Sequence, residues 1–330
     1  MTPVSLSPIN NTLNQRIGSY RLIDFGRGRK LERVAGRCLV RPSPAAEGVR
    51  PADPDAWGNA ESVFDLGRRK WKHHRPWPDD LLADCGRFEM PVAPTPFGHI
   101  GLFPEQQDNW QWLMSPGPLR CKGLLETEGR EHTDAPEVAG DRPAALNLFA
   151  YTGASTMALA TAGFAVAHVD AAKPNVATAR RAAAVNGLTD WPIRYLVDDA
   201  AKFAAREVRR GRHYHTIVLD PPAYGHAPGG KAWRIERDLW PLLDHCLQLA
   251  QPAGHRLLIT GHSPQVDQHV VKDFLIRHGY DSGMIRTGRS QLTDQQGRRL
   301  DAGFFVRVDT RGGSETSVEN AEPTRRPKPA

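Results

Sequence analysis

The chain has 330 residues, which exceeds one average domain, and 40% of them are hydrophobic, enough for a packed core. No uninterrupted apolar run of the length that spans a bilayer occurs, and residues 1–14 lack the basic and apolar regions of a secretory signal. The four cysteines show no CxxC spacing, which argues against a disulfide framework or a zinc site. We therefore expect a cytoplasmic protein with no membrane partner and no metal.

The first third of the chain is rich in proline, glycine and tryptophan and contains short β-like runs. The run 20–25 is followed by Gly26-Arg27-Gly28-Arg29-Lys30, which is typical of a hairpin turn. These features predict a smaller β-rich accessory domain over residues 1–110.

From residue 143 onward, apolar β-like runs alternate with alanine-rich helical stretches. This alternation predicts an α/β domain over residues 111–309, with a Rossmann-like and mostly parallel sheet. A late strand over 303–308 is expected at the edge or in a hairpin, antiparallel to the rest. Residues 310–330 are polar and proline-rich, so we expect a disordered tail. The expected parallel strands are 144–149, 165–170, 193–197, 216–219 and 256–260.

The turn after the first of these strands has the features of a nucleoside site. Gly153 at the turn would let a ligand approach the backbone, and the following helix offers free N–H groups. Asp170 ends the next strand, where a carboxylate can accept both ribose hydroxyls of an adenosine cofactor. The three-glycine pattern of dinucleotide enzymes is absent from this turn, which favours S-adenosylmethionine over NAD.

Acidic residues also follow the third strand. Asp198 or Asp199 could accept the exocyclic amine of adenine. Asp199 could equally be the N-cap of the next helix, and the two roles are compatible.

The fourth strand ends in Asp220-Pro221-Pro222, the most specific motif of the chain. Two prolines make a rigid turn, and Asp220 can accept a hydrogen from an amine held against it. Tyr224 or Trp233 could stack on a planar base. Methyl transfer needs little more than in-line placement of a nucleophile, so we predict that Asp220, Pro221, Pro222 and Tyr224 form the catalytic loop.

These motifs, in this order, resemble those of the class I methyltransferases that modify 23S ribosomal RNA at cytosine C5 or guanine N7. The resemblance spans about residues 98–308 and includes the segment 101–110, which in this family packs beside the methionine part of the cofactor. It implies S-adenosyl-L-methionine as the cofactor. The cofactor-binding residues predicted from the motifs and the resemblance are Phe103, Gln106, Asn109, Asn147, Phe149, Tyr151, Gly153, Asp170, Asp198, Asp199, Ala200 and Asp220.

One departure from the family bears on the chemistry. Members that methylate cytosine C5 resemble one another in a cysteine just after the fifth strand, whereas residues 258–264 of this chain contain none. Cys246 lies in the preceding helix and is expected to be buried. Direct attack by a nitrogen or oxygen on the cofactor methyl is therefore the favoured reaction.

The acceptor is predicted from charge as well as from the resemblance. The net charge is +6, and basic residues cluster at Arg68–Arg75, around Trp71, and at Arg206–Arg212. Such islands fit the phosphate backbone of RNA, with ribosomal RNA as the first expected acceptor, or they simply form a solvated surface. The alternatives are a protein or small-molecule acceptor, or a non-catalytic protein that binds S-adenosylmethionine.

Overall fold

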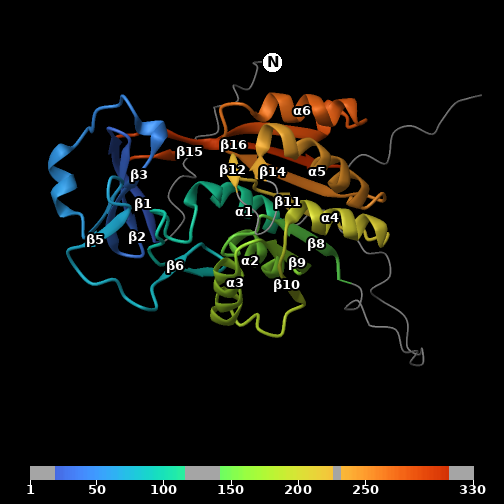
Figure 1. Cartoon of the computed structure of the whole chain (residues 1–330), viewed down its shortest axis with the longest axis horizontal. Coiled ribbons are helices and arrows are strands. Elements are labelled where there is room, and N and C mark those ends of the chain that lie inside the picture. The colour runs from blue at the N-terminus through green and yellow to red at the C-terminus, as the bar shows by residue number, and fades with distance from the viewer. Residues whose placement is uncertain (1–18, 116–141, 226–231, 312–330) are drawn as a thin grey trace, which may run out of the picture.

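The computed structural model describes residues 19–115, 142–225 and 232–311, which form two main sheets (Figure 1). Cys121 and the predicted tail from residue 312 onward lie outside the described residues. Within the described part, no helix has the length and apolar character needed to cross a bilayer. The boundary expected at residue 110 remains a prediction.

The N-terminal sheet has five strands in chain order, with β3 and β4 parallel and the other neighbours antiparallel. The predicted hairpin is confirmed, because Arg27 and Gly28 form a two-residue turn with φ of 51° and 70°. A small hairpin of two further strands follows. The strands are β1 (Tyr20–Gly26), β2 (Arg29–Val34), β3 (Arg37–Pro42), β4 (Ser62–Asp65), β5 (Lys70–His73), β6 (Leu82–Asp84) and β7 (Glu89–Pro91).

The larger sheet has seven strands in the order β10-β9-β8-β11-β14-β16-β15. The first five are parallel, and β16 lies antiparallel between β14 and β15. The predicted α/β class is thus confirmed. The expected late antiparallel strand is confirmed as a hairpin strand, because β16 pairs with the preceding β15. The sequence analysis missed β15, which takes the edge position instead. The strands are β8 (Ala144–Leu148), β9 (Ala165–Asp170), β10 (Ile193–Val197), β11 (Thr216–Leu219), β14 (Arg256–Gly261), β15 (Ile285–Thr293) and β16 (Arg299–Asp309).

Helices cover both faces of this sheet. Leu146, Ile217 and Ile259 of the central strands are fully buried, as expected for parallel strands that lie between two helical layers. The helices α1 (Gln107–Met114), α2 (Ala154–Thr161) and α3 (Lys173–Val185) contribute to one core cluster. The helices α4 (Ala200–Arg209), α5 (Ile235–Leu249) and α6 (Gln268–Arg277) contribute to the other, and the short strands β12 (Tyr224–Gly225) and β13 (Trp233–Arg234) precede α5.

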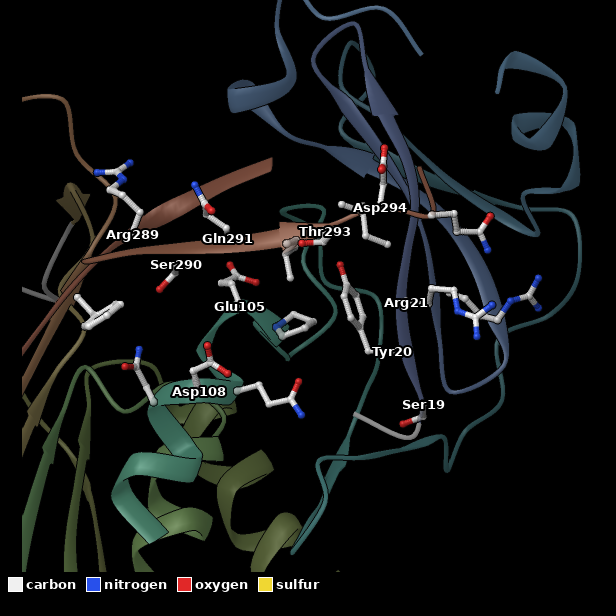
Figure 2. A pocket seen from close by; sticks show the side chains of 18 of the residues that line it. Ser19, Tyr20, Arg21, Glu105, Asp108, Arg289, Ser290, Gln291, Thr293 and Asp294 are labelled. Carbon is white, nitrogen blue, oxygen red and sulfur yellow. The ribbon is translucent and has the colours of Figure 1, made fainter. Parts of the chain in front are cut away.

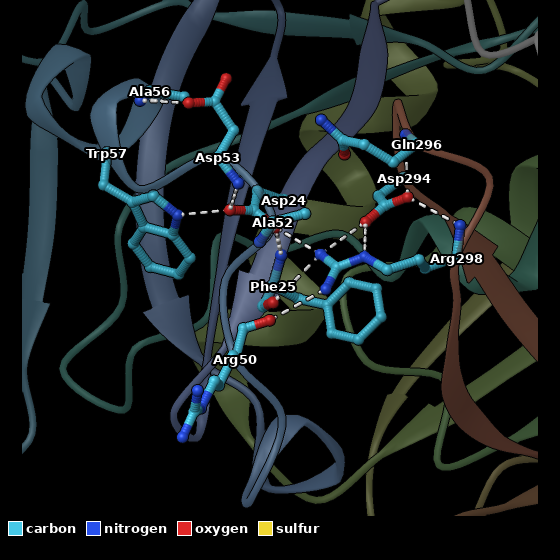
Figure 3. A network of polar contacts seen from close by, with 10 residues as sticks. All are labelled: Asp24, Phe25, Arg50, Ala52, Asp53, Ala56, Trp57, Asp294, Gln296 and Arg298. Atoms are coloured by element: carbon cyan, nitrogen blue, oxygen red, sulfur yellow. Dashed lines mark hydrogen bonds and ion pairs between the residues drawn. The ribbon is translucent and has the colours of Figure 1, made fainter.

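The tip of the β15–β16 hairpin joins the two sheets (Figure 3). Asp24 of β1 is completely buried and forms an ion pair with Arg298, which also donates to Asp294 at 2.7 Å. Burial alone would raise the pKa of Asp24, but hydrogen bonds from Trp57 and from nearby backbone N–H groups outweigh it and lower that pKa. We call this ion-pair network the Asp24 junction. Apolar contacts beside it come from Leu22, Phe25, Leu292 and Leu300.

Replacing Arg298 by Met should destabilise the protein, because it leaves Asp24 and Asp294 buried without a cation while the apolar stem over Phe25 is kept. We expect a loss of about 2–4 kcal/mol in the free energy of unfolding, measured by urea denaturation. Arg299→Met, at an exposed neighbouring position, is the control. Equal stability of the two variants would contradict a structural role for the junction.

Candidate functional site

A cleft of about 540 Å³ opens at the carboxyl ends of the parallel strands. It lies where connections from β8 and β11 leave in opposite directions, which is the position where open α/β sheets bind ligands. The cleft is lined by residues that follow β8, β9, β10, β11 and β14, together with residues from the segment before α1.

The turn after β8 has an unusual backbone. Phe149 and Tyr151 have φ of 55° and 49°, a conformation that costs non-glycine residues about 1–3 kcal/mol each. Three hydrogen bonds hold the turn: Ala150 N donates to Val169 O at 3.0 Å, Tyr151 N to the Asp170 carboxylate at 2.8 Å, and Thr152 Oγ1 to Gly101 O at 2.5 Å. The strained conformation places both aromatic residues in the cleft wall, as predicted for them.

Gly153 follows in the same turn with φ of 97°, but it does not line the cleft. A Cβ atom at this position would lie 2.8 Å from Ala179 Cβ, so the glycine permits close packing of α2 on α3. Its local role is therefore to let α2 begin directly behind the turn.

A comparison of two glycines tests this role. Gly153 and Gly163 have nearly equal φ, 97° and 96°, but the space around a Cβ at Gly163 is empty. Gly163→Ala should cost about 1–2 kcal/mol from backbone strain, and Gly153→Ala about 1–3 kcal/mol more from overpacking. Urea denaturation of both variants measures the difference, and equal losses would show that Ala179 does not restrict the site.

Two further predicted residues are not brought into the cleft. Asn147 is buried behind the turn, where its side chain donates to Thr156 Oγ1 at 2.9 Å. Asn109 is also buried, donates to Gln106 Oε1 at 2.6 Å and accepts from Arg307 at 2.7 Å. Sequence reasoning could not separate them from cleft residues, because both lie in segments whose other members do line it, Phe103 and Gln106 among them.

Asp170 lines the cleft at the end of β9. Its carboxylate accepts hydrogen bonds from Tyr151 N at 2.8 Å, Ala172 N at 2.9 Å and Asn175 Nδ2 at 3.0 Å. A carboxylate has about four acceptor positions, so this one is oriented by the protein and keeps capacity for a ligand hydroxyl.

Asp198, Asp199 and Ala200 line the cleft after β10. The N-cap role expected of Asp199 is confirmed, since its side chain accepts from Lys202 N at 2.9 Å. Asp198 forms an ion pair with Arg206 of α4. Both carboxylates therefore stabilise the start of α4 and still border the cavity.

Asp220 is half-buried in the cleft wall after β11 and accepts a hydrogen bond from Thr260 Oγ1 at 2.6 Å. Burial raises the pKa of Asp220 to about 6. The negative charge of Glu105 also raises this pKa, whereas the hydrogen bond from Thr260 lowers it. A carboxylate with such a pKa can exchange a proton near neutral pH. Pro221 and Pro222 also line the cleft.

The aromatic residue beside this loop is Trp233. It lines the cleft, lies 4.9 Å from Phe149 between ring centroids, and donates from Nε1 to Pro222 O at 2.7 Å. Tyr224 is 53% exposed and is not among the cleft-lining residues. Of the two stacking candidates, the structure thus places Trp233 at the cavity.

Several residues of the cleft wall were not predicted as site residues. Glu105 is the most distinctive, because its Oε2 atom is buried and has no hydrogen-bond partner among the described residues. It directly precedes the predicted Gln106. A charged residue beside the amide side chains of this segment was the sequence signal that could have indicated its place in the cleft. Others are His99, Ala171, Ala172, Asn175 and Ala302.

The cysteines of the described chain are all away from the cleft. Cys246 is completely buried in α5, as expected, and Cys38 and Cys85 are buried as well. In the same part of the chain, no group of three or more His, Cys, Asp or Glu side chains is arranged to hold a metal ion.

The two basic islands lie at opposite ends of the molecule, on β5 and at the end of α4 (Figure 1). Lys70, Lys72 and Arg75 are exposed in the first island. In the second, Arg209 and Arg212 are exposed, whereas Arg206 is taken up by its ion pair with Asp198.

Comparison with known proteins identifies the fold. No family model matches the chain. A SAM-dependent methyltransferase structure from Agrobacterium tumefaciens is 29% identical and covers 88% of this chain and 90% of its own, with a TM-score of 0.74. A second structure, described as a methyltransferase complexed with SAH, is 16% identical and covers 90% of this chain and 77% of its own, with a TM-score of 0.64. The chain has the fold of the class I S-adenosylmethionine-dependent methyltransferases.

Sequence comparison narrows the relationship. The chain is 31% identical over 169 residues to ribosomal RNA large subunit methyltransferase I of Shewanella amazonensis, which covers 49% of this chain and 42% of the relative. It is 34% identical over 126 residues to ribosomal RNA large subunit methyltransferase K/L of Methylococcus capsulatus. This match covers 38% of this chain and 17% of the relative. The matches thus span less than half the length of these relatives.

Proposed function

We propose that this protein is an S-adenosyl-L-methionine-dependent methyltransferase that methylates a base of ribosomal RNA. The observation that carries the proposal is the cleft at the switch point of the sheet, which has Asp170 at one strand end and the Asp220-Pro221-Pro222 loop at another. The similarity to large-subunit ribosomal RNA methyltransferases supports the choice of acceptor.

The cleft fits the cofactor in its parts. Asp170 retains acceptor capacity for ribose hydroxyls, and Asp198 and Asp199 border the place where the adenine would lie. Phe149 and Tyr151 provide the wall on the methionine side, together with Phe103, Gln106 and Ala200 around the cavity. When bound, the cofactor supplies an electrophilic methyl group on a positively charged sulfur.

The protein's own residues orient the acceptor. Asp220 accepts an N–H of the base, which directs the nitrogen lone pair at the methyl carbon. Ionised Asp220 would be placed to take the proton that the nitrogen gives up when it receives the methyl group. Trp233 stacks on the base. No cysteine lines the described cleft, so the reaction proceeds by direct attack without a covalent enzyme intermediate.

The exposed islands Arg68–Arg75 and Arg206–Arg212 would add phosphate contacts that bring RNA to the surface. Their positions at opposite ends of the molecule fit a large folded RNA better than a small acceptor. A protein acceptor remains the second candidate, and the transfer assay below distinguishes the two.

Replacing Asp170 by Asn should weaken binding of S-adenosylhomocysteine at least tenfold, because a neutral amide accepts the ribose hydroxyls less well than a carboxylate. Isothermal titration calorimetry measures the affinity, and circular dichroism verifies the fold. Asp190→Asn removes the same charge at an exposed position and should bind as the wild type does. Equal affinities of the two variants would remove Asp170 from the site.

Labelled S-adenosylmethionine should transfer its methyl group to large-subunit RNA from a strain that lacks this protein. Because Asp220 must be ionised, kcat/KM should fall about tenfold per pH unit below about pH 6. Asp220→Asn should lower kcat roughly 10²–10⁴-fold and abolish that pH dependence. Label in protein but not in RNA would establish the second candidate, and label in neither would refute the proposal.

A further inference from the structure

A second cavity, of about 760 Å³, lies between the two sheets (Figure 2). Ser19, Tyr20 and Arg21 line it from the N-terminal sheet, residues of the segment before α1 and of α1 itself line it from below, and β15 lines its other side. We call it the junction cavity, because the Asp24 junction closes one end of it through Asp294.

The wall on the N-terminal sheet carries uncompensated positive charge. Arg21 and Arg33 are direct partners across the antiparallel β1–β2 pair, and both are exposed and line the cavity. Like charges at such positions destabilise a sheet. Among the described residues neither arginine has a carboxylate within ion-pair distance, and Arg33 makes only a 3.4 Å hydrogen bond to Gly36 O. The pair is therefore arranged for an anion.

The part of the cavity formed by α1 and the segment before it carries negative charge, with Arg307 in the same lining close enough to Asp108 for the two charges to interact. Glu105 and Asp108 both line it, and neither forms an ion pair with a described residue. Figure 2 shows Glu105 below β15 and Asp108 on α1, both on the side of the cavity away from Arg21. Because the charges are separated rather than paired, a complementary ligand has an anionic group at one end and N–H donors at the other. A nucleotide, with its phosphate and its base edge, has this distribution.

The junction cavity also borders the catalytic cleft at one residue. Glu105 lines both, and its buried Oε2 atom lacks a donor. A strand whose target base lies against Asp220 would therefore reach the junction cavity with a neighbouring nucleotide. A free mononucleotide would occupy only one of the two cavities, whereas an RNA strand could place neighbouring nucleotides in both.

Resting on the proposed function, we infer that the junction cavity holds a nucleotide next to the methylated base, with its phosphodiester on Arg21 and Arg33 and its base toward Glu105 and Asp108. This site differs from the two basic islands, because no residue of Arg68–Arg75 or Arg206–Arg212 lines the junction cavity. It makes the N-terminal sheet part of the acceptor site.

The test is binding of a fluorescein-labelled single-stranded oligocytidylate by anisotropy over a series of salt concentrations. For the double variant Arg21→Gln/Arg33→Gln we expect roughly tenfold weaker binding near 0.1 M salt. The slope of log K against log salt should fall in magnitude by about 0.7, the value for the one phosphate contact that both arginines share. Binding of S-adenosylhomocysteine should be unchanged, and the KM for RNA should rise with little change in kcat.

The matched control is Arg87→Gln/Arg277→Gln, which removes the same charge from two exposed arginines that line neither cavity. Equal losses in both double variants would show general charge attraction and overturn the inference. The inference would also be overturned if Arg21→Gln/Arg33→Gln kept the affinity and slope of the wild type. The same holds if the wild type did not bind the RNA. If the wild type binds RNA but transfers no methyl group, the proposed function fails while the salt slopes still decide whether the cavity holds phosphate.

Discussion

The carboxylate of Asp170 connects the two central turns of the larger sheet. It accepts the backbone N–H of Tyr151 after β8 and that of Ala172 after β9, so one side chain sets the spacing of two neighbouring strand ends. The strained backbone of Phe149 and Tyr151 persists because this carboxylate and Thr152 hold it from both sides. The shape of the cleft follows from these bonds.

A second constraint concerns the N-terminal sheet. Its β1 strand is fixed to the tip of the β15–β16 hairpin by the ion pair of Asp24 with Arg298, and apolar residues of both elements pack beside it. The hairpin thus belongs to the larger sheet at one end and supports the N-terminal sheet at the other. Because the two sheets are held in this way, the junction cavity between them has a defined shape and lies next to the catalytic cleft.

The chemistry of the cleft follows from unequal environments of its carboxylates. Asp170 accepts hydrogen bonds from three N–H donors, whereas the half-buried Asp220 accepts one from a hydroxyl and has a pKa of about 6. The first is suited to hold hydroxyl groups permanently, and the second to bind and exchange a proton. The difference arises from packing around β11, not from the type of residue.

The sequence by itself determined the order of strands and helices and the residues at strand ends, since alternation and turn chemistry are local properties. It therefore located Asp170, Asp199 and Asp220 at the edge of the sheet. Only the tertiary structure decided that Asn109, Asn147 and Gly153 face away from the cleft, that Trp233 replaces Tyr224 beside it, and that Glu105 belongs to it. It also revealed β15, whose mixed pattern reflects a bulge and one exposed face. These outcomes depend on contacts between segments far apart in the chain, and neighbouring residues carry no signal for them.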